Sequence, residues 1–365
     1  MRVVHVAECV GGVERYLQSL LKYSKCENIV ILSQRYNKDN YESLASHVEI
    51  VNMFHGIRIS ALKEAFKIRK LIKKYDPDIV YAHSSIAGAI TRLACLGLKC
   101  KVIYNPHGWA FNMEKSKKEL FVMLERIMAI FCDAIICISD AEKVSAVRER
   151  ICNKNKLHVI YNGIDFDEHN NNNNNIINLN IPENNFVVGM VGRICKQKAP
   201  DIFVRMAAKV KKQIKNTYFI IVGDVLEGRE DEKQEIIDLA KELGVNLYIT
   251  GWVKNPLDYV SCFDVGCLFS RWEGFGLVIP EYMISKVPIV ATKVDAIPYL
   301  IEDGIDGMLV EKDDWNTAAE RVKDLLLNED LKNRIVKNEY ITVTKRFDAK
   351  RVSKECEELY YDLLD

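Results

Sequence analysis

The chain has 365 residues, more than one compact core usually supports, and this length suits two domains of ordinary size. With 48% hydrophobic and 28% charged residues, its composition is that of a globular protein. Its 51 basic and 51 acidic residues cancel, which argues against a nucleic-acid-binding protein, since these usually carry a basic excess. The sequence contains no run of 18 or more apolar residues, so we predict no membrane-spanning helix. The opening MRVVHVAECVGG indicates a buried strand and a glycine turn rather than a signal peptide.

Eleven cysteines are scattered along the chain without a CxxC pair, whereas disulfide frameworks and zinc sites need tighter spacing. Cys137, Cys262 and Cys267 lie in or beside apolar runs, so we interpret them as small core residues. This usage suits a reducing compartment and predicts a cytoplasmic protein.

In the first half of the chain, short apolar strands alternate with longer amphipathic helices. This alternation predicts βα units around a parallel sheet whose two faces are both covered. The expected strands are 3–7, 29–32, 79–82, 102–104 and 134–138, and the expected helices are 13–23, 59–75, 86–96 and 119–131.

A run of six asparagines at 170–175 interrupts the alternation. Asparagine disfavours both regular structures, and the run has no apolar face to bury. We therefore predict a first domain over 1–165, followed by an exposed asparagine-rich linker over 166–184.

The alternation resumes after the linker and predicts a second domain over 185–345. The expected strands are 186–191, 218–222, 247–249, 265–268 and 287–291, with helices at 200–214 and 278–284 and a mostly helical tail at 314–365. The predicted fold class is thus α/β, with two Rossmann-like, doubly wound domains. Ligands of such sheets bind at the carboxyl ends of the strands, so we expect a site in a cleft between the domains.

Three loops at predicted strand ends suit an anionic or sugar ligand. Gly11–Gly12 would let backbone N–H groups approach an anion, although a plain tight turn explains the pair equally well. NPHGW at 105–109 places His107 at a strand end, where it either contacts substrate or bonds a nearby carbonyl. GRICKQK at 192–198 offers Arg193 and Lys198 to a phosphate, although basic loop residues are often only solvated.

A fourth loop, SRWEGFGLVIPE at 270–281, places Glu273 and Glu281 on two sides of a glycine-rich turn that opens a helix. A carboxylate in such a position suits a bidentate hydrogen bond to a sugar diol. A helix-capping role explains one glutamate at a helix start, but not both glutamates together with the glycines.

These motifs together resemble the signature of family 4 retaining glycosyltransferases, which have the GT-B fold of two Rossmann-like domains facing a cleft. The resemblance rests on Glu-x7-Glu in EGFGLVIPE and extends over nearly the whole chain through GGVER, NPHGW, NGID, GRICKQK and TGWV. It implies that the tail FDAKRVSKECEELY, within 346–365, is a helix that packs back toward the first domain. It also implies a metal-independent enzyme without a cofactor, of the kind found in bacterial surface polysaccharide biosynthesis. Such an enzyme moves a sugar from a nucleotide-diphosphate sugar, most commonly a UDP-sugar, to a glycan or lipid-linked saccharide.

The resemblance also implies residue roles. Glu273 and His107 resemble the groups beside the reacting sugar, and Arg193 and Lys198 the pair that holds the donor diphosphate. Glu281 resembles the glutamate that binds the nucleotide ribose. The other implied donor contacts come from backbone groups: Gly11, Gly12, Phe275, Gly276 and Leu277 toward phosphate and sugar, and Gly251, Trp252 and Val253 toward the base.

One loop departs from the family pattern, because Asp295–Ala296 and Tyr299 stand where paired glycines and a glutamate are usual. This change leaves open a non-catalytic sugar-nucleotide-binding subunit. A second alternative is a nucleotide-sugar epimerase, which shares the GT-B fold and needs no separate acceptor. Asp165–Phe166–Asp167 mimics a metal-binding DxD, but it lies beside the linker rather than at a strand end, so we predict no metal site there.

The segment 59–75 carries six Lys and Arg residues around an apolar stripe. Such a helix either lies on an anionic membrane or is an ordinary solvated helix that covers a sheet. Residues 112–118, with three lysines before an apolar helix, raise the same alternatives. Peripheral attachment at the inner face of the membrane would suit a lipid-linked acceptor.

Overall fold

In a computed structural model of the protein, residues 1–53, 60–113, 115–168, 181–182 and 184–365 are described. The asparagine run at 170–175, expected in the linker, lies outside the described residues. Contacts divide the chain into two compact units. Unit 1 comprises Met1–Ile164 and Asp348–Asp365, and unit 2 comprises Asp165–Phe347.

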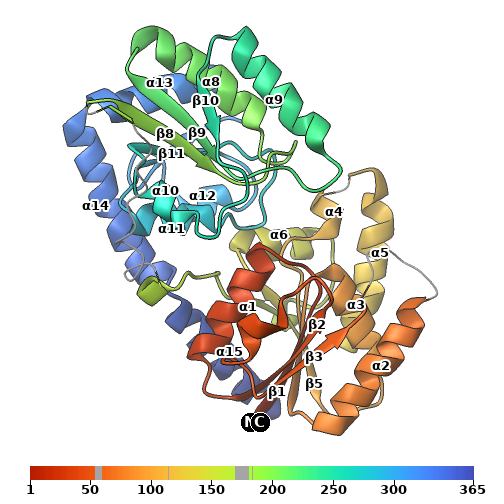
Figure 1. The fold of residues 1–365 in the computed structure, drawn as a ribbon. Coiled ribbons are helices and arrows are strands. Elements are labelled where there is room, and N and C mark those ends of the chain that lie inside the picture. The colour runs from red at the N-terminus through yellow and green to blue at the C-terminus, as the bar shows by residue number, and fades with distance from the viewer. Residues whose placement is uncertain (54–59, 114, 169–180, 183) are drawn as a thin grey trace. The chain divides into compact units, whose positions relative to one another are not determined.

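The described strands of unit 1 form a parallel sheet of seven in the order β3-β2-β1-β4-β5-β6-β7 (Figure 1). The order reverses direction between β1 and β4, where Ala7 pairs with His83. Such a reversal leaves the carboxyl ends of two neighbouring strands open to a ligand. The strands are β1 (Arg2–Ala7), β2 (Glu27–Ser33), β3 (His47–Val51), β4 (Ile79–His83), β5 (Lys101–Asn105), β6 (Ala134–Cys137) and β7 (Leu157–Val159).

Helices cover both faces of this sheet because its strands alternate their side chains between two apolar cores. Val4 and Val6 of β1 pack with α2, α3 and α5, whereas Val3 packs with α1 and α15 on the opposite face. Both chain termini belong to unit 1 (Figure 1), where Met1 and Leu363 pack against the same apolar core. The helices are α1 (Gly12–Tyr23), α2 (Ser60–Tyr75), α3 (Ser85–Ala94), α4 (Ala110–Met113), α5 (Lys118–Met128), α6 (Asp140–Arg148) and α15 (Ala349–Leu364), with 3-10 turns η1 (Lys38–Tyr41), η2 (Lys115–Lys117), η3 (Ala129–Phe131) and η4 (Lys154–Lys156).

The chain returns to unit 1 between α14 and α15. The N–H of Phe347 still bonds the Val343 carbonyl at the end of α14, and the side chain of Asp348 then accepts the N–H of Lys350. Because Asp348 caps the new helix, α15 begins at Ala349 rather than at the expected 346. Its buried face, which includes Cys356 and Tyr360, packs beside α1.

The described strands of unit 2 form a parallel sheet of six in the order β10-β9-β8-β11-β12-β13, which reverses between β8 and β11. Helices α8, α9 and α13 share one apolar core with the sheet, and α11 packs against α14. The strands are β8 (Phe186–Val191), β9 (Thr217–Val222), β10 (Leu247–Ile249), β11 (Val265–Leu268), β12 (Ile289–Thr292) and β13 (Met308–Val310). The helices are α8 (Pro200–Gln213), α9 (Glu230–Glu242), α10 (Leu257–Val260), α11 (Val278–Ile284), α12 (Ile297–Leu300), α13 (Trp315–Leu327) and α14 (Glu329–Arg346).

The predicted α/β class with two Rossmann-like domains is confirmed. The strands that the sequence analysis did not predict all lie at sheet edges. β3, β7 and β13 are edge strands of three to five residues. An edge strand is paired on one side only and needs no long apolar run. Of the cysteines interpreted as core residues, Cys137 and Cys267 are fully buried, whereas Cys262 is only partly buried. No helix in the described ranges combines the length and apolarity needed to cross a membrane.

Candidate active site

In the parallel sheet of unit 2, the order in which strands are added changes side between β8 and β11. The loops that follow these two strands meet at the carboxyl ends of the strands. Lys198, from the loop after β8, places its Nζ 2.6 Å from Oε2 of Glu273, in the loop after β11. Oγ of Ser270 donates to the same carboxylate oxygen at 3.0 Å. The Lys198 and Glu273 side chains are only 15% and 10% exposed, so the ion pair is well shielded from solvent. The sequence predicted both residues, and the structure brings them together.

The loop that carries Glu273 is clamped by the guanidinium of Arg271. Nη1 and Nη2 bond the two carboxylate oxygens of Asp201 in α8 at 3.0 and 2.6 Å, and Nε bonds Asp313 at 2.8 Å. Nη1 also donates to the Lys196 carbonyl at 3.0 Å. A fork of this kind fixes direction as well as distance. The loops after β8 and β11 are therefore held in one relative position.

Asp295, which stands where the family has glycine, forms a contact that the sequence analysis did not predict. Its Oδ2 accepts the backbone N–H of Glu273 at 2.9 Å. The residue has a φ of 43°, in the left-handed region that aspartate tolerates better than most residues. Ser270, Arg271 and Asp295 were all missed as supports of Glu273. A usable signal was present, since all three are polar residues that closely follow the ends of neighbouring strands.

Arg193 is exposed and bonds Gln197 within its own loop, Nη2 to Oε1 at 3.3 Å. Gln197 in turn donates to the Trp272 carbonyl at 3.1 Å. The loop after β9 adjoins this one, because the N–H of Ile194 bonds the Asp224 carbonyl at 3.0 Å. Arg193 and Lys198 thus lie on one loop, and their predicted role at a diphosphate remains a prediction.

The loop after β10 adjoins the loop after β9 through a bridge between Gly223 and Gly251. Gly251 has a φ of +75°, which favours glycine at this turn. The indole N–H of Trp252 bonds the Val225 carbonyl at 3.1 Å, while the side chain stays 61% exposed. Val253 is partly buried beside it. The three residues predicted for a base pocket therefore lie on one loop at the carboxyl edge of the sheet.

The glycine-rich turn leads into α11 at Val278, as the sequence predicted. Gly276 has a φ of +85°, whereas Leu277 takes a right-handed helical conformation. Phe275 is buried and packs edge-to-face on Phe347 at 5.8 Å, so only its backbone suits a ligand contact. Glu281 is 3% exposed, and its carbonyl accepts both the N–H and the hydroxyl of Ser285.

A buried tyrosine positions α11. The hydroxyl of Tyr282 accepts the backbone N–H of Val191, the last residue of β8, at 2.9 Å. Gly266 in β11 leaves room for the ring, since a Cβ there would lie 2.7 Å from it. Packing of Tyr282 on the sheet therefore holds the start of α11, and with it Glu281, beside the end of β8.

In unit 1, His107 lies two residues after the end of β5 and has a φ of 50°, and its backbone N–H bonds Oδ1 of Asn105 at 3.0 Å. Its ring lies edge-to-face on Tyr16, with 4.8 Å between centroids. Burial lowers the pKa of His107 to about 3, so the imidazole is neutral at physiological pH. Gly11, with a φ of +87°, and Gly12 are exposed at the start of α1.

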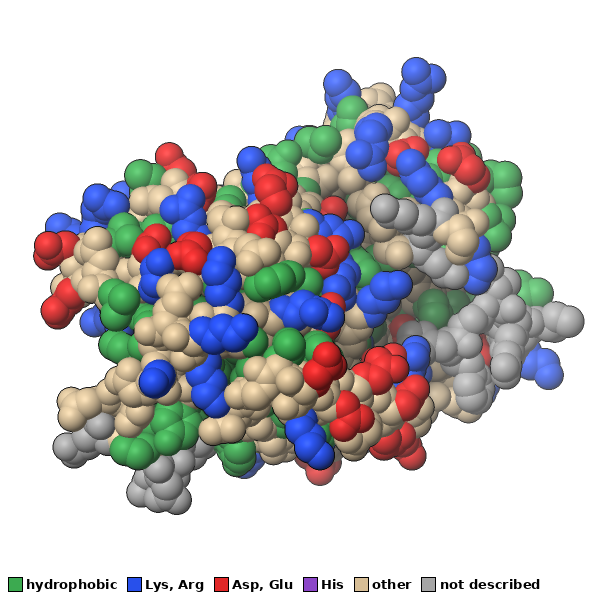
Figure 2. Space-filling view, turned by 90° about the horizontal axis from the view of Figure 1, so that it is seen from above, with side chains coloured by type: hydrophobic (Ala, Val, Ile, Leu, Met, Phe, Trp, Pro, Cys, Tyr) green, Lys and Arg blue, Asp and Glu red, His purple; other side chains and the backbone are tan. Residues whose placement is uncertain are grey.

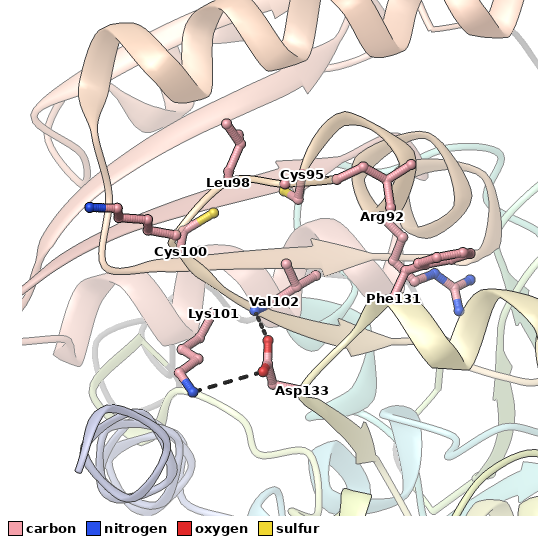
Figure 3. A pocket seen from close by; sticks show the side chains of 11 residues that line it. Arg92, Cys95, Leu98, Cys100, Lys101, Val102, Phe131 and Asp133 are labelled. Carbon is pink, nitrogen blue, oxygen red and sulfur yellow. Dashed lines mark hydrogen bonds and ion pairs between the residues drawn. The ribbon is translucent and has the colours of Figure 1, made fainter.

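Two further features lie away from the candidate donor-binding loops described above. Oδ1 of Asp165 accepts the N–H groups of Asp167 and Glu168, so the first aspartate of the DxD mimic caps a local turn. A pocket of about 330 Å³ includes Lys101, Val102 and Asp133, whose carboxylate bonds the Val102 N–H at 2.7 Å (Figure 3). It lies at the amino end of β5, opposite to Asn105 and His107.

The 51 basic and 51 acidic residues of the protein balance in total. On the face seen in Figure 2, basic and acidic side chains are interspersed rather than gathered by sign. A more concentrated basic surface lies on α2 of unit 1, where Lys63, Lys67, Lys70, Lys73 and Lys74 are exposed.

Comparison with known proteins identifies the family. Residues 10–168 match the family described as Glycosyltransferase Family 4, and residues 171–342 match Glycosyl transferases group 1. The chain belongs to glycosyltransferase family 4. A Klebsiella pneumoniae relative, described as an uncharacterized 41.2 kDa protein in the cps region, is 32% identical over 95% of this chain and 100% of its own.

Two further comparisons concern one relative by sequence and one solved structure. The UDP-Gal:alpha-D-GlcNAc-diphosphoundecaprenol alpha-1,3-galactosyltransferase of Escherichia coli is 29% identical to this glycosyltransferase over 84% of this chain and 81% of its own. HepE of Anabaena, solved in complex with UDP and glucose, aligns with a TM-score of 0.86 and 21% identity over 98% of this chain and 99% of its own. That structure supports the GT-B fold.

Proposed function

We propose that this enzyme moves a sugar from a UDP-sugar to a lipid-linked saccharide in polysaccharide biosynthesis, with retention of anomeric configuration and without a metal ion. The observation that carries the proposal is the shielded Lys198–Glu273 pair at the carboxyl ends of β8 and β11. A lysine there can bind a diphosphate, and a carboxylate can accept from sugar hydroxyl groups.

The proposed reaction breaks the bond between the sugar C1 and the diphosphate oxygen. A new bond forms on the same face of C1 to an acceptor hydroxyl, whose proton passes to the departing phosphate. Negative charge grows on the diphosphate as the bond breaks, and Lys198 and Arg193 would stabilise that charge. In this proposal Glu273 orients the sugar and forms no covalent intermediate.

The donor and acceptor classes rest on the relatives. The printed name of the Escherichia coli relative gives UDP-Gal as donor and a diphosphoundecaprenol-linked sugar as acceptor. HepE was solved with UDP and glucose. The Klebsiella relative belongs to a cps region. We therefore propose a UDP-sugar donor and a lipid-linked acceptor here, with the choice of sugar left to experiment.

An acceptor of that kind would be held in a membrane, and unit 1 has a surface suited to one. The exposed apolar side chains of α5 and η3 recur every three or four residues, which places them on one side of the helical segment. Two more are exposed on α2, beside the lysines named above. These exposed apolar side chains are Leu62 and Phe66 on α2, and Leu120, Met123, Ile127 and Ile130 on α5 and η3. Together with neighbouring basic residues, such side chains suit an anionic bilayer.

The function is tested by incubating the purified enzyme with UDP-, GDP- and ADP-sugars in EDTA, with and without an undecaprenyl-diphosphate-linked saccharide. We expect release of UDP from one donor only when the acceptor is present, and a product with the anomeric configuration of the donor. Conversion of a donor without any acceptor would support an epimerase instead. Activity restored only by a divalent metal would overturn metal independence.

A further inference from the structure

Three histidines from neighbouring strands of unit 1 form a hydrogen-bonded chain that ends at His107. Nε2 of His107 lies 3.2 Å from Nδ1 of His83, the last residue of β4. Nε2 of His83 lies 3.2 Å from Nδ1 of His5 in β1. Nε2 of His5 lies 3.3 Å from Oδ1 of Asn28 in β2. The chain thus crosses β2, β1 and β4 and reaches the loop after β5.

The amide of Asn28 sets the direction of this chain. Its Nδ2 donates to the Cys26 carbonyl at 3.2 Å, which directs Oδ1 toward His5. Turning the amide over would place two oxygens against each other at Cys26. An amide oxygen only accepts, so Nε2 of His5 carries a proton.

The remaining protons follow from the valence of neutral imidazole, which has one donor and one acceptor nitrogen. With its proton on Nε2, His5 accepts at Nδ1 from Nε2–H of His83. His83 then accepts at Nδ1 from Nε2–H of His107. Nδ1 of His107 is left without a proton, and no described residue hydrogen-bonds it.

The surroundings keep these rings neutral. His5 and His83 are buried, and the tyrosines Tyr16 and Tyr81 make ring contacts with the histidines. Burial lowers the pKa of His5 to about 4. Burial also lowers the pKa of His83 well below its ordinary value, and the neighbouring His107 and His5 lower it further. A second proton on His5 or His83 would reverse the hydrogen bonds between that ring and His107, and a second proton on His107 would occupy its Nδ1. Neutral rings therefore preserve the tautomer of His107.

We propose that Asn28, His5 and His83 are positioning residues that hold His107 as the Nε2–H tautomer and leave its Nδ1 as a hydrogen-bond acceptor for a ligand hydroxyl. A bare nitrogen lone pair attracts an O–H donor and repels a phosphate oxygen. The identity of that hydroxyl as a sugar hydroxyl rests on the proposed function. The tautomer itself does not.

The tautomers can be read directly in the wild-type enzyme. The chain has seven histidines, so a two-bond ¹H–¹⁵N correlation spectrum of ¹⁵N-histidine-labelled protein is simple, and single His→Gln variants assign it. We expect protonated Nε2 and bare Nδ1 at His5, His83 and His107 near pH 7. A protonated Nδ1 at His107 overturns the inference without any variant being needed.

A second measurement separates positioning from simple packing. Asn28→Leu removes the acceptor, so we expect His107 to become a mixture of tautomers and kcat/KM to fall about tenfold, the loss of one hydrogen bond. Asn112→Leu is the matched control, since Asn112 bonds Ser145 in the same unit and should change kcat/KM less than about twofold.

The outcomes distinguish this inference from the proposed function. The expected tautomers in a protein with no transferase activity would retain the histidine chain and reject the function. Transferase activity with an unchanged His107 spectrum in Asn28→Leu would support the proposed function and reject the role of the histidine chain.

Discussion

Lys198 and Glu273 lie 75 residues apart in sequence, yet Nζ and Oε2 are 2.6 Å apart. The contact exists because β8 and β11 are neighbours at the point where the sheet order reverses. Both side chains are largely shielded from solvent. Ser270 also donates a hydrogen bond to Glu273, and Asp295 accepts one from it. A diphosphate bound here would compete with Glu273 for Lys198, which would free the carboxylate to accept from sugar hydroxyl groups.

Replacing Lys198 tests this site. Lys198→Ala removes a cation from the growing charge of the leaving group, so we expect kcat/KM to fall by roughly 100-fold. The measurement is the initial rate of nucleotide diphosphate release. Lys209→Ala is the matched control, because Lys209 pairs with Glu320 at 3.1 Å on the surface of the same unit and should leave the rate unchanged. Equal losses in both variants would reject a special role for Lys198.

A buried ion pair in unit 1 gives a prediction about stability. Oε2 of Glu125 accepts from both terminal nitrogens of Arg92 at 3.1 Å, and Oε1 accepts the Tyr104 hydroxyl at 2.9 Å. Glu125→Gln leaves a buried guanidinium without its counter-ion, so we expect the unfolding free energy to drop by about 3 kcal/mol in urea titrations. Arg92→Met with Glu125→Leu should recover most of that loss.

A surface pair provides the control for that experiment. Glu49→Gln removes the partner of Lys74, and the exposed pair should contribute less than about 1 kcal/mol. If Glu125→Gln were no more harmful than Glu49→Gln, or if the double variant were worse than the single one, the buried pair would not stabilise the unit as described.

Glu142 predicts a pH dependence of stability. Burial raises the pKa of its carboxyl from 4.5 to about 8, while the Ile138 N–H that it accepts acts in the opposite direction. Between these values the unfolded chain ionises and the folded protein does not. The native state therefore loses stability as the pH rises from 4.5 to about 8, by on the order of a few kcal/mol, and no more above that.

Glu142→Gln keeps a carbonyl for the Ile138 N–H but cannot ionise. Relative to wild type, the variant should gain stability as the pH is raised from 5 to 8.5, measured as the urea midpoint. Glu320→Gln is the control, because the pKa of Glu320 is lowered to about 2, chiefly by Lys323, and its carboxylate is already ionised throughout this range. Parallel curves for wild type and Glu142→Gln would contradict the prediction.

The exposed apolar side chains of α2, α5 and η3 predict binding to anionic vesicles. Met123→Ser with Ile127→Ser removes two of them from α5, so we expect flotation with phosphatidylglycerol liposomes at low salt to fall at least about tenfold, since each side chain would bury its apolar area in the bilayer. Ile305→Ser with Leu327→Ser removes exposed apolar residues from unit 2 and should leave flotation unchanged. Absence of wild-type binding at low salt would reject the membrane proposal.

Much of the fold was predictable from the sequence, because the central strands of a parallel sheet are buried on both faces and appear as apolar runs. Of these central strands, β8 and β11 were predicted at their observed bounds, and α11 was predicted to begin at Val278. The edge strand β10 was also predicted at its observed bounds. Prediction failed at the other edge strands, β3, β7 and β13, since a strand paired on one side only does not need a long apolar run. It also failed to foresee the buried pair behind Glu125, because its partner Arg92 lies on another helix.

The sequence by itself determined which residues could bind a donor, since glycines, cations and carboxylates at strand ends are local features. Only the tertiary structure decided which of them meet and what supports them. The sequence shows that Asp295 departs from the family pattern, but its bond to the Glu273 N–H depends on where β11 and β12 end. Likewise, His5 and His83 reach His107 only because strands distant in sequence pair in register, and hydrogen bonds act over about 3 Å regardless of sequence separation.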